Sequence, residues 1–226
     1  MENVVKKKGY FRELDKSLGI SELLHAEVID KTAPAPVHWW DHAGLSCFGG
    51  LTFLFFIMQT VSGLFLLVYY QPHPDEAYAS VQYIDSYVNL GWFFRRSHAI
   101  CSNLMMITVI IHMLKVFFTG AYKKPREMHW VSGFVLLLFT LGACFTGYCL
   151  PWNQMSFWAL TVVTNSLSSI PFIGTYLVEF VRGGENVTGV TLLRFFAFHL
   201  IIPVTMLIFL LAHFYMIRKT GISEPL

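Results

Sequence analysis

Four histidines lie inside apolar stretches of this chain, and they form two pairs with one spacing. His98 and His112 are 14 residues apart, and so are His199 and His213. In an α-helix, 14 residues make about four turns less 40° and rise about 21 Å. Each pair therefore lies on one helix face, with one member near each side of a bilayer. Imidazole is costly in lipid and marks function, so two such helices predict two stacked six-coordinate haems.

The composition supports a membrane location. Hydrophobic residues make up 55% of the 226 residues and charged residues 13%, whereas soluble domains carry about 25% charge. Four stretches are long and apolar enough to span a bilayer as helices: about 44–70, 98–118, 130–150 and 192–217. We therefore expect an all-α membrane protein, in which residues 44–226 form a four-helix transmembrane bundle around two stacked b-type haems.

The segments outside the spans have distinct characters. Residues 1–43 lack the apolar core of a cleaved signal peptide. Within them, 10–32 carries apolar residues at helical spacing among charges, which predicts an amphipathic helix on the membrane surface. Residues 71–97 form a polar loop, and 151–191 is expected to form short surface helices that cover one end of the bundle.

Basic residues give the orientation. They cluster before the first span, after the second and after the fourth, whereas the opposite loops hold only Arg95, Arg96, Arg182 and Arg194. The positive-inside rule places both termini on the cytoplasmic side. A formal charge of +2 gives no indication of nucleic acid binding.

This topology decides which histidines pair. The second and fourth spans both follow a loop on the far side of the membrane, so they run in the same direction. His98 and His199 are therefore expected to bind a far-side haem iron, and His112 and His213 a cytoplasmic-side one. The histidines outside the spans are assigned solvated or interfacial roles: His25, His38, His42, His73 and His129.

Glycines repeat the histidine interval on the other two spans. Gly49 and Gly63 are 14 residues apart, as are Gly133 and Gly147. Glycine is common in membrane helices because it lets them pack closely. Two pairs that match the histidine interval instead favour flat gaps that admit haem edges.

Arginines and cysteines complete the candidate cofactor residues. Arg95, Arg126 and Arg218 flank the expected haem ends, where guanidinium groups suit propionate carboxylates; Arg96 is a further candidate. Cysteine occurs without CxxC or CxxCH spacing, so a zinc ribbon or a conventional c-type haem attachment is not indicated. Cys101, Cys144 and Cys149 are interpreted as small buried apolar residues.

From about residue 40 onward, the sequence resembles the N-terminal half of cytochrome b. The segments that carry the resemblance are GWFFRRSHAI, GAYKKPRE, FTGYCLPWNQMSFWALTVVTNSLSSIPFIGT and LLRFFAFHL. The split form is the better match, as in the cytochrome bf complex and its bacterial bc-type relatives. In that form the second half is a separate subunit, which resembles subunit IV and carries the Pro-Glu-Trp-Tyr motif absent here.

The resemblance implies a subunit of a quinol:cytochrome c (or plastocyanin-like acceptor) oxidoreductase that is inactive alone. Quinol would be oxidised on the far side, with one electron passing to a Rieske iron–sulfur protein and a c-type cytochrome. The other electron would cross to a quinone on the cytoplasmic side, coupled to proton translocation. The resemblance also implies a dimer of complexes in a bacterial cytoplasmic or thylakoid-type membrane. Its quinol pocket would be walled by Tyr148, Pro151, Trp152, Met155 and Phe157.

Two local features refine the resemblance. In the split family, a cysteine two residues before the first glycine attaches an extra haem by one thioether bond, and Cys47 in SCFGG has this position; the alternative is a structural thiol. The interval of 14 between His199 and His213, with Pro203 between them, instead matches the mitochondrial type, which has one fewer residue there than the chloroplast type. The sequence therefore does not decide the type of quinone, or whether the role is respiratory or photosynthetic.

Two other readings remain. A dihaem membrane anchor of a dehydrogenase or hydrogenase would share the histidine pairs, but it would lack the LPWNQMSFW segment and the KKPRE turn. A structural or transport subunit without a cofactor would leave the four histidines and the matched glycines unexplained.

Overall fold

The computed structural model describes residues 47–221, which form a succession of α-helices joined by short connections. The helices are α4 (Phe48–Tyr69), α5 (Ala77–Ser86), α6 (Gly91–Phe118), α7 (Glu127–Cys149), α8 (Gln154–Leu167), α9 (Gly174–Arg182) and α10 (Gly189–Thr220). The amphipathic helix expected within residues 1–43 lies outside the described residues.

Four of these helices, α4, α6, α7 and α10, are long and apolar enough to cross a membrane. The prediction of an all-α fold with four membrane-spanning helices is confirmed. Two helices extend well beyond their predicted spans: α6 begins at Gly91, and α10 runs from Gly189 to Thr220. The apolar window marks only the lipid core, whereas backbone hydrogen bonding continues into the polar interface. Arg95 and Arg96 therefore lie on α6 itself.

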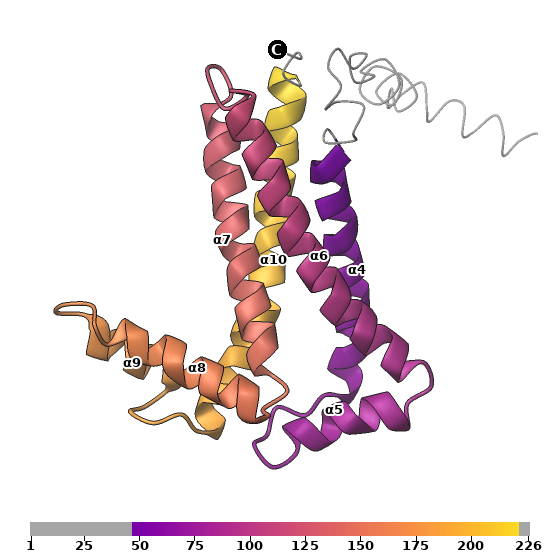
Figure 1. Cartoon of the computed structure of the whole chain (residues 1–226), viewed down its shortest axis with the longest axis vertical. Helices are drawn as coiled ribbons and strands as arrows, with labels where there is room; N and C mark the ends of the chain where they lie inside the picture. Colours follow the sequence, from indigo (N-terminus) through magenta and orange to yellow (C-terminus); the bar gives the residue numbers. More distant parts are fainter. Residues whose placement is uncertain (1–46, 222–226) are drawn as a thin grey trace, which may run out of the picture.

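The four long helices pack as two pairs. Helix α4 packs mainly against α6, and α7 packs mainly against α10; Figure 1 shows the two pairs side by side. Each pair joins a helix that carries two of the histidines to a helix that carries two of the matched glycines. The bundle therefore contains this pairing of a histidine helix with a glycine helix twice.

Short helices cover one end of the bundle. Helices α5, α8 and α9 lie at the end opposite the C-terminal end of α10 (Figure 1). We call this end the roof end, and the opposite end, with the turn between α6 and α7, the turn end. Helices α8 and α9 lie in the segment expected to form surface helices. Helix α5 was not expected in the polar loop 71–97; its Asp85 holds Arg95 of α6 in an ion pair of 2.5 Å.

Buried polar contacts hold the roof end together. Arg182 of α9 is buried, and it donates to Thr164 Oγ1 at 2.8 Å and to Asn165 Oδ1 at 2.7 Å on α8. Tyr70, which follows α4, donates its hydroxyl to the carbonyl oxygen of Leu150 at 2.7 Å. Burial raises the pKa of Tyr70, so the phenol stays protonated and keeps donating. The Arg182 bonds join α9 to α8, and the Tyr70 bond joins the end of α4 to the end of α7.

One apolar layer divides the bundle between its two ends. Phe56, Met105, Leu136 and Met206 form a buried cluster to which each long helix contributes one residue. Met105 lies midway in sequence between His98 and His112, and Met206 midway between His199 and His213. The layer therefore separates the upper and lower histidines.

Candidate functional site

The structure brings His98 and His199 together at the roof end. Their ring centroids are 6.2 Å apart, and the ring planes are at 75° to each other. A metal–imidazole bond is about 2 Å long and the bonded nitrogen lies about 1 Å from the ring centre, so two axial ligands of one metal have centroids about 6 Å apart. The two rings therefore have the separation that a shared iron requires.

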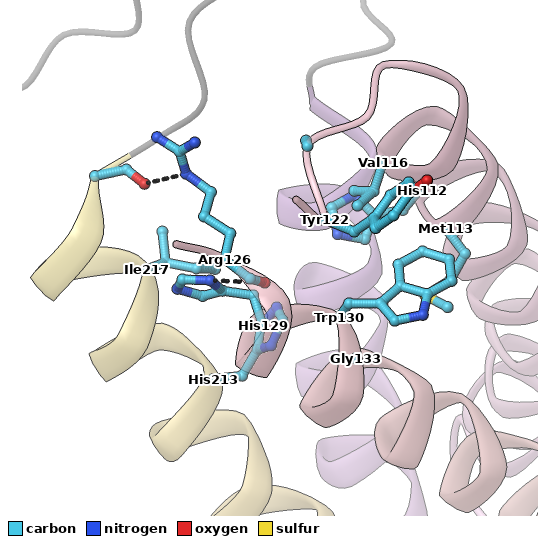
Figure 2. Close-up of a pocket in the computed structure, with 12 residues that line it drawn as sticks. His112, Met113, Val116, Tyr122, Arg126, His129, Trp130, Gly133, His213 and Ile217 are labelled. Carbon is cyan, nitrogen blue, oxygen red and sulfur yellow. Dashed lines mark hydrogen bonds between the residues drawn. The ribbon is translucent and has the colours of Figure 1, made fainter. Parts of the chain in front are cut away.

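His112 and His213 face one pocket at the turn end. Figure 2 shows His112 on the side of this pocket formed by α6 and His213 on the side formed by α10. Tyr122, Trp130 and Gly133 also line it. The two histidine-bearing helices therefore offer one imidazole each at both ends of the bundle.

Each matched glycine lies against one of these imidazoles. A Cβ added at the glycine would approach the imidazole Cε1 at 2.7 Å for Gly147 and His199, 3.0 Å for Gly49 and His112, 3.2 Å for Gly63 and His98, and 3.6 Å for Gly133 and His213. We expected these glycines to clear a path for haem edges. The structure shows that they leave room for the imidazoles, most strictly at Gly147; the clearance for haem edges stays a prediction.

Three hydroxyl side chains that the sequence analysis did not single out contact the histidine rings. Ser62 Oγ lies 2.9 Å from His98 Nδ1, Ser132 Oγ 2.7 Å from His213 Nδ1, and Thr146 Oγ1 3.1 Å from His199 Nδ1. Each hydroxyl residue directly precedes one of the matched glycines. This repeated dipeptide was the signal in the sequence.

His129, assigned a solvated or interfacial role from the sequence, lies in the first turn of α7 and lines the turn-end pocket. Its ring centroid is 6.4 Å from that of His213, with the planes at 83°. Its Nδ1 lies 3.3 Å from the carbonyl oxygen of Arg126, and its Nε2 lies 3.1 Å from Thr220 Oγ1. His129 precedes Gly133 by one helical turn, so both face the same imidazole.

The three candidate arginines differ in their surroundings. Arg126 lines the turn-end pocket and donates from Nε to the carbonyl oxygen of Gly221 at 3.4 Å (Figure 2). Arg218 lies in the last turn of α10, at the same end. Arg95 is engaged by Asp85 at the roof end. Arg126 and Arg218 are thus grouped near the His112–His213 pocket.

The candidate quinol-pocket residues begin where α7 ends. Trp152 and Phe157 are in edge-to-face contact, with centroids 5.6 Å apart, and they line a roof-end pocket with Asn153, Gln154 and Trp158. Tyr148 and Met155 are exposed and do not line this pocket, nor does Pro151. Trp152 has a positive φ of 52°, an uncommon conformation for a bulky residue. The chain turns sharply there between α7 and α8.

Cys47 is an exposed free thiol at the N-cap of α4. It precedes Gly49 by two residues, and Gly49 lies against His112. The thiol therefore belongs to the turn end of the bundle. Within residues 47–221, no three His, Cys, Asp or Glu side chains gather to hold a metal ion. A six-coordinate haem iron needs only two protein ligands.

The comparisons with known proteins identify the family. The family model described as Cytochrome b/b6/petB matches residues 29–221. The chain belongs to the cytochrome b/b6 family. The resemblance stated from the sequence is therefore confirmed, and with it the assignment to a membrane electron-transport subunit of a quinol-oxidising oxidoreductase. A b-type haem is the cofactor that this family implies.

Individual relatives agree with this assignment. The chain is 48% identical over 181 residues to cytochrome b6 of Mesostigma viride, covering 80% of this chain and 84% of the relative. It is 46% identical over 181 residues to cytochrome b6 of Heliobacterium mobile, covering 80% and 85%. A chain of a hyperthermophilic respiratory complex III has the same fold, with a TM-score of 0.84 and 31% identity. That match covers 95% of this chain but only 56% of the complex III chain.

Proposed function

We propose that this cytochrome b/b6 protein carries electrons across the membrane between a quinol-oxidation site and a quinone-reduction site, through two b haems. The observation that carries the proposal is the pair His98 and His199, one from each helix pair, with ring centroids 6.2 Å apart. A second pair, His112 and His213, faces one pocket at the other end. When bound, the haems supply one-electron carriers near both membrane surfaces.

The residues divide the work of holding these cofactors. His98 and His199 bind the iron at the roof end, and His112 and His213 bind the iron at the turn end. The facing glycines leave space beside the rings, because a Cβ would crowd three of the four imidazoles. Arg126 and Arg218 provide guanidinium groups for propionates at the turn end.

Quinol oxidation belongs at the roof end in this proposal. Trp152 and Phe157 offer aromatic faces at the pocket where α7 meets α8, and aromatic side chains suit the planar ring of a quinol. Tyr148 and Met155 are exposed beside it, on a surface that a second subunit completes. Oxidation of a quinol there would release two electrons and two protons at the roof end, and reduction of a quinone at the turn end would take up electrons and protons, so that turnover moves protons across the membrane.

The turn end holds an additional haem attached to Cys47. The exposed thiol at the start of α4 and its place two residues before Gly49 support this proposal. A haem-stained denaturing gel tests it. Haem should stay on the 25.9 kDa band, disappear in Cys47→Ser and persist in the control Cys144→Ser. A wild-type band without haem would overturn the attachment and leave the two b haems unaffected.

The partners follow from the proposed reaction. A C-terminal-half subunit, a Rieske iron–sulfur protein and a c-type cytochrome complete the complex, which is a dimer in a bacterial cytoplasmic or thylakoid-type membrane. Both termini lie on the cytoplasmic side. The 48% identity to cytochrome b6 of Mesostigma viride, over 84% of that relative, supports a complex of the cytochrome bf type.

A pulse of oxidant given to the purified complex tests the reaction. With quinol present, oxidising the c-type acceptor should transiently increase reduction of the b haems, because the two electrons of one quinol take separate routes. A dihaem anchor without divided routes would show only oxidation of its haems. Trp152→Ala should weaken the response, whereas Trp92→Ala, on α6 away from the roof-end pocket, should preserve it. Haem oxidation alone in the wild type would overturn the proposal.

A further inference from the structure

Three of the four ligand histidines share one local arrangement. The Nδ1 atoms of His98, His213 and His199 lie 2.9, 2.7 and 3.1 Å from the hydroxyls of Ser62, Ser132 and Thr146. Each hydroxyl comes from the residue before the glycine that faces the same ring. The glycine admits the imidazole, and the hydroxyl beside it reaches Nδ1.

The helix backbone decides which group donates in these contacts. Ser62 Oγ donates to the carbonyl oxygen of Met58 at 2.6 Å, and Thr146 Oγ1 donates to that of Gly142 at 2.8 Å. A hydroxyl has one proton, so with this proton engaged its oxygen can only accept from the ring. Nδ1 of His98 and of His199 therefore carries the hydrogen, and Nε2 keeps the lone pair that binds a metal.

The same holds for the third ring. Ser132 Oγ donates to the carbonyl oxygen of His129 at 3.0 Å and accepts from Nδ1 of His213. Through this carbonyl, the position of His129 is linked to the ring of His213. All three hydroxyls therefore favour the tautomer in which Nδ1 carries the hydrogen and Nε2 keeps its lone pair.

We propose that Ser62, Ser132 and Thr146 are positioning residues that set the reduction potentials of the two haem sites. The proposal rests on the haem ligation proposed above. An acceptor on the outer nitrogen of a metal-bound imidazole raises the basicity of the ligand. A more basic ligand stabilises ferric over ferrous iron, so each hydroxyl lowers the potential of the iron that its histidine binds.

Within residues 47–221, the hydroxyls that contact these rings are distributed unequally between the two ends. Ser62 and Thr146 act on the roof-end pair, whereas Ser132 acts on one ring of the turn-end pair. The fourth glycine, Gly49, follows Phe48, which offers no hydroxyl to His112. Removal of these hydroxyls should therefore act on two rings at the roof end and on one ring at the turn end.

One of the three contacts has a substitute acceptor. The carbonyl oxygen of Ala143 lies 3.1 Å from Nδ1 of His199, as close as Thr146 Oγ1. Loss of the Thr146 hydroxyl would leave this carbonyl to receive the same hydrogen. The structure therefore ranks Ser62 above Thr146 in its effect on the roof-end potential.

A redox titration of the purified holo-complex tests the proposal, with each haem followed by its optical and electron paramagnetic resonance signals. Ser62→Ala should raise the roof-end potential alone, and Ser132→Ala the turn-end potential alone. Thr146→Val should give a smaller rise than Ser62→Ala. A tenfold weaker preference for ferric iron corresponds to about 59 mV for one electron. Ser62→Thr should restore the wild-type value.

Controls separate this role from general damage. Ser102→Ala removes a hydroxyl from the same bundle that contacts Cys144 Sγ, and it should move neither potential. If Ser62→Ala does not retain haem, Ser62→Cys, with its weaker acceptor, should give an intermediate shift. Unchanged potentials in Ser62→Ala and Ser132→Ala, or equal shifts of both haems, would overturn the inference. Retention of the roof-end haem in His98→Ala would instead overturn the proposed ligation.

Discussion

Replacing the matched glycines one at a time by alanine gives a graded test of the site. The substitution is the same at each position, but the added Cβ meets the facing imidazole at different distances. At Gly147 it lies 2.7 Å from His199 Cε1, well inside van der Waals contact, whereas at Gly133 it lies 3.6 Å from His213 Cε1, an ordinary contact. Both glycines are on α7, so Gly133→Ala is a matched control for Gly147→Ala.

The two effects of the substitution can be estimated separately. Overpacking of this kind costs about 1–3 kcal/mol, and replacing a helical glycine by alanine gains about 1 kcal/mol. Gly133→Ala should therefore be neutral or slightly stabilising. Gly147→Ala should be less stable than Gly133→Ala by about 1–3 kcal/mol. If the imidazole of His199 moves to relieve the contact, the same free energy weakens haem binding by about 5- to 140-fold, at 1.4 kcal/mol per tenfold.

Haem content and thermal loss of the Soret band in the purified complex measure this difference. We expect Gly147→Ala to lose the roof-end haem selectively, with Gly49→Ala and Gly63→Ala intermediate and Gly133→Ala like the wild type. Equal losses in Gly133→Ala and Gly147→Ala would refute the reasoning. That result would mean that the glycines make room only for the edge of the haem. The effect of each alanine would then not depend on the distance from its Cβ to the imidazole.

Three further predictions concern the roof end. Arg182→Leu removes a buried guanidinium and leaves its hydrogen-bond acceptors without a donor. It should lower the free energy of unfolding by about 3 kcal/mol and make α8 and α9 more sensitive to proteolysis. Resistance equal to that of the wild type would contradict this. Tyr70→Phe loses only the bond to Leu150 and should lower stability by about 1 kcal/mol, measured by thermal unfolding, with a larger loss pointing to another role. Asp85→Asn breaks the partly exposed pair with Arg95 and should cost below about 1 kcal/mol, with the difference from wild type vanishing at high salt.

The sequence predicted the fold, and it predicted which histidines of the second and fourth spans lie close together. Helical spacing placed His98 and His112 on one face, and the direction of the spans paired His98 with His199. The two rings do lie side by side. These inferences succeeded because helix geometry and the bilayer leave few alternatives to long apolar segments.

The finer parts of the site depended on local packing that periodicity does not describe. Ser62, Ser132 and Thr146 each directly precede a matched glycine; this repeat is visible in the sequence, but the ring positions are needed to show what the hydroxyls contact. His129 follows the KKPRE turn and looked interfacial, yet the start of α7 directs it toward His213. Helix α5 lies in a polar loop, yet its Ala77 and Ile84 are buried, and Gly91 packs closely against the backbone of Ile84; hydropathy does not show this packing.

The central claim is that two haems are each held by one histidine of α6 and one of α10 at the same end of the bundle. The most direct measurement is a redox titration of the b haems in the four single histidine-to-alanine variants of the complex. We predict that His98→Ala and His199→Ala lose one and the same haem, and that His112→Ala and His213→Ala lose the other. Loss of the same haem in His98→Ala and His112→Ala, or full haem content in any variant, would contradict the account.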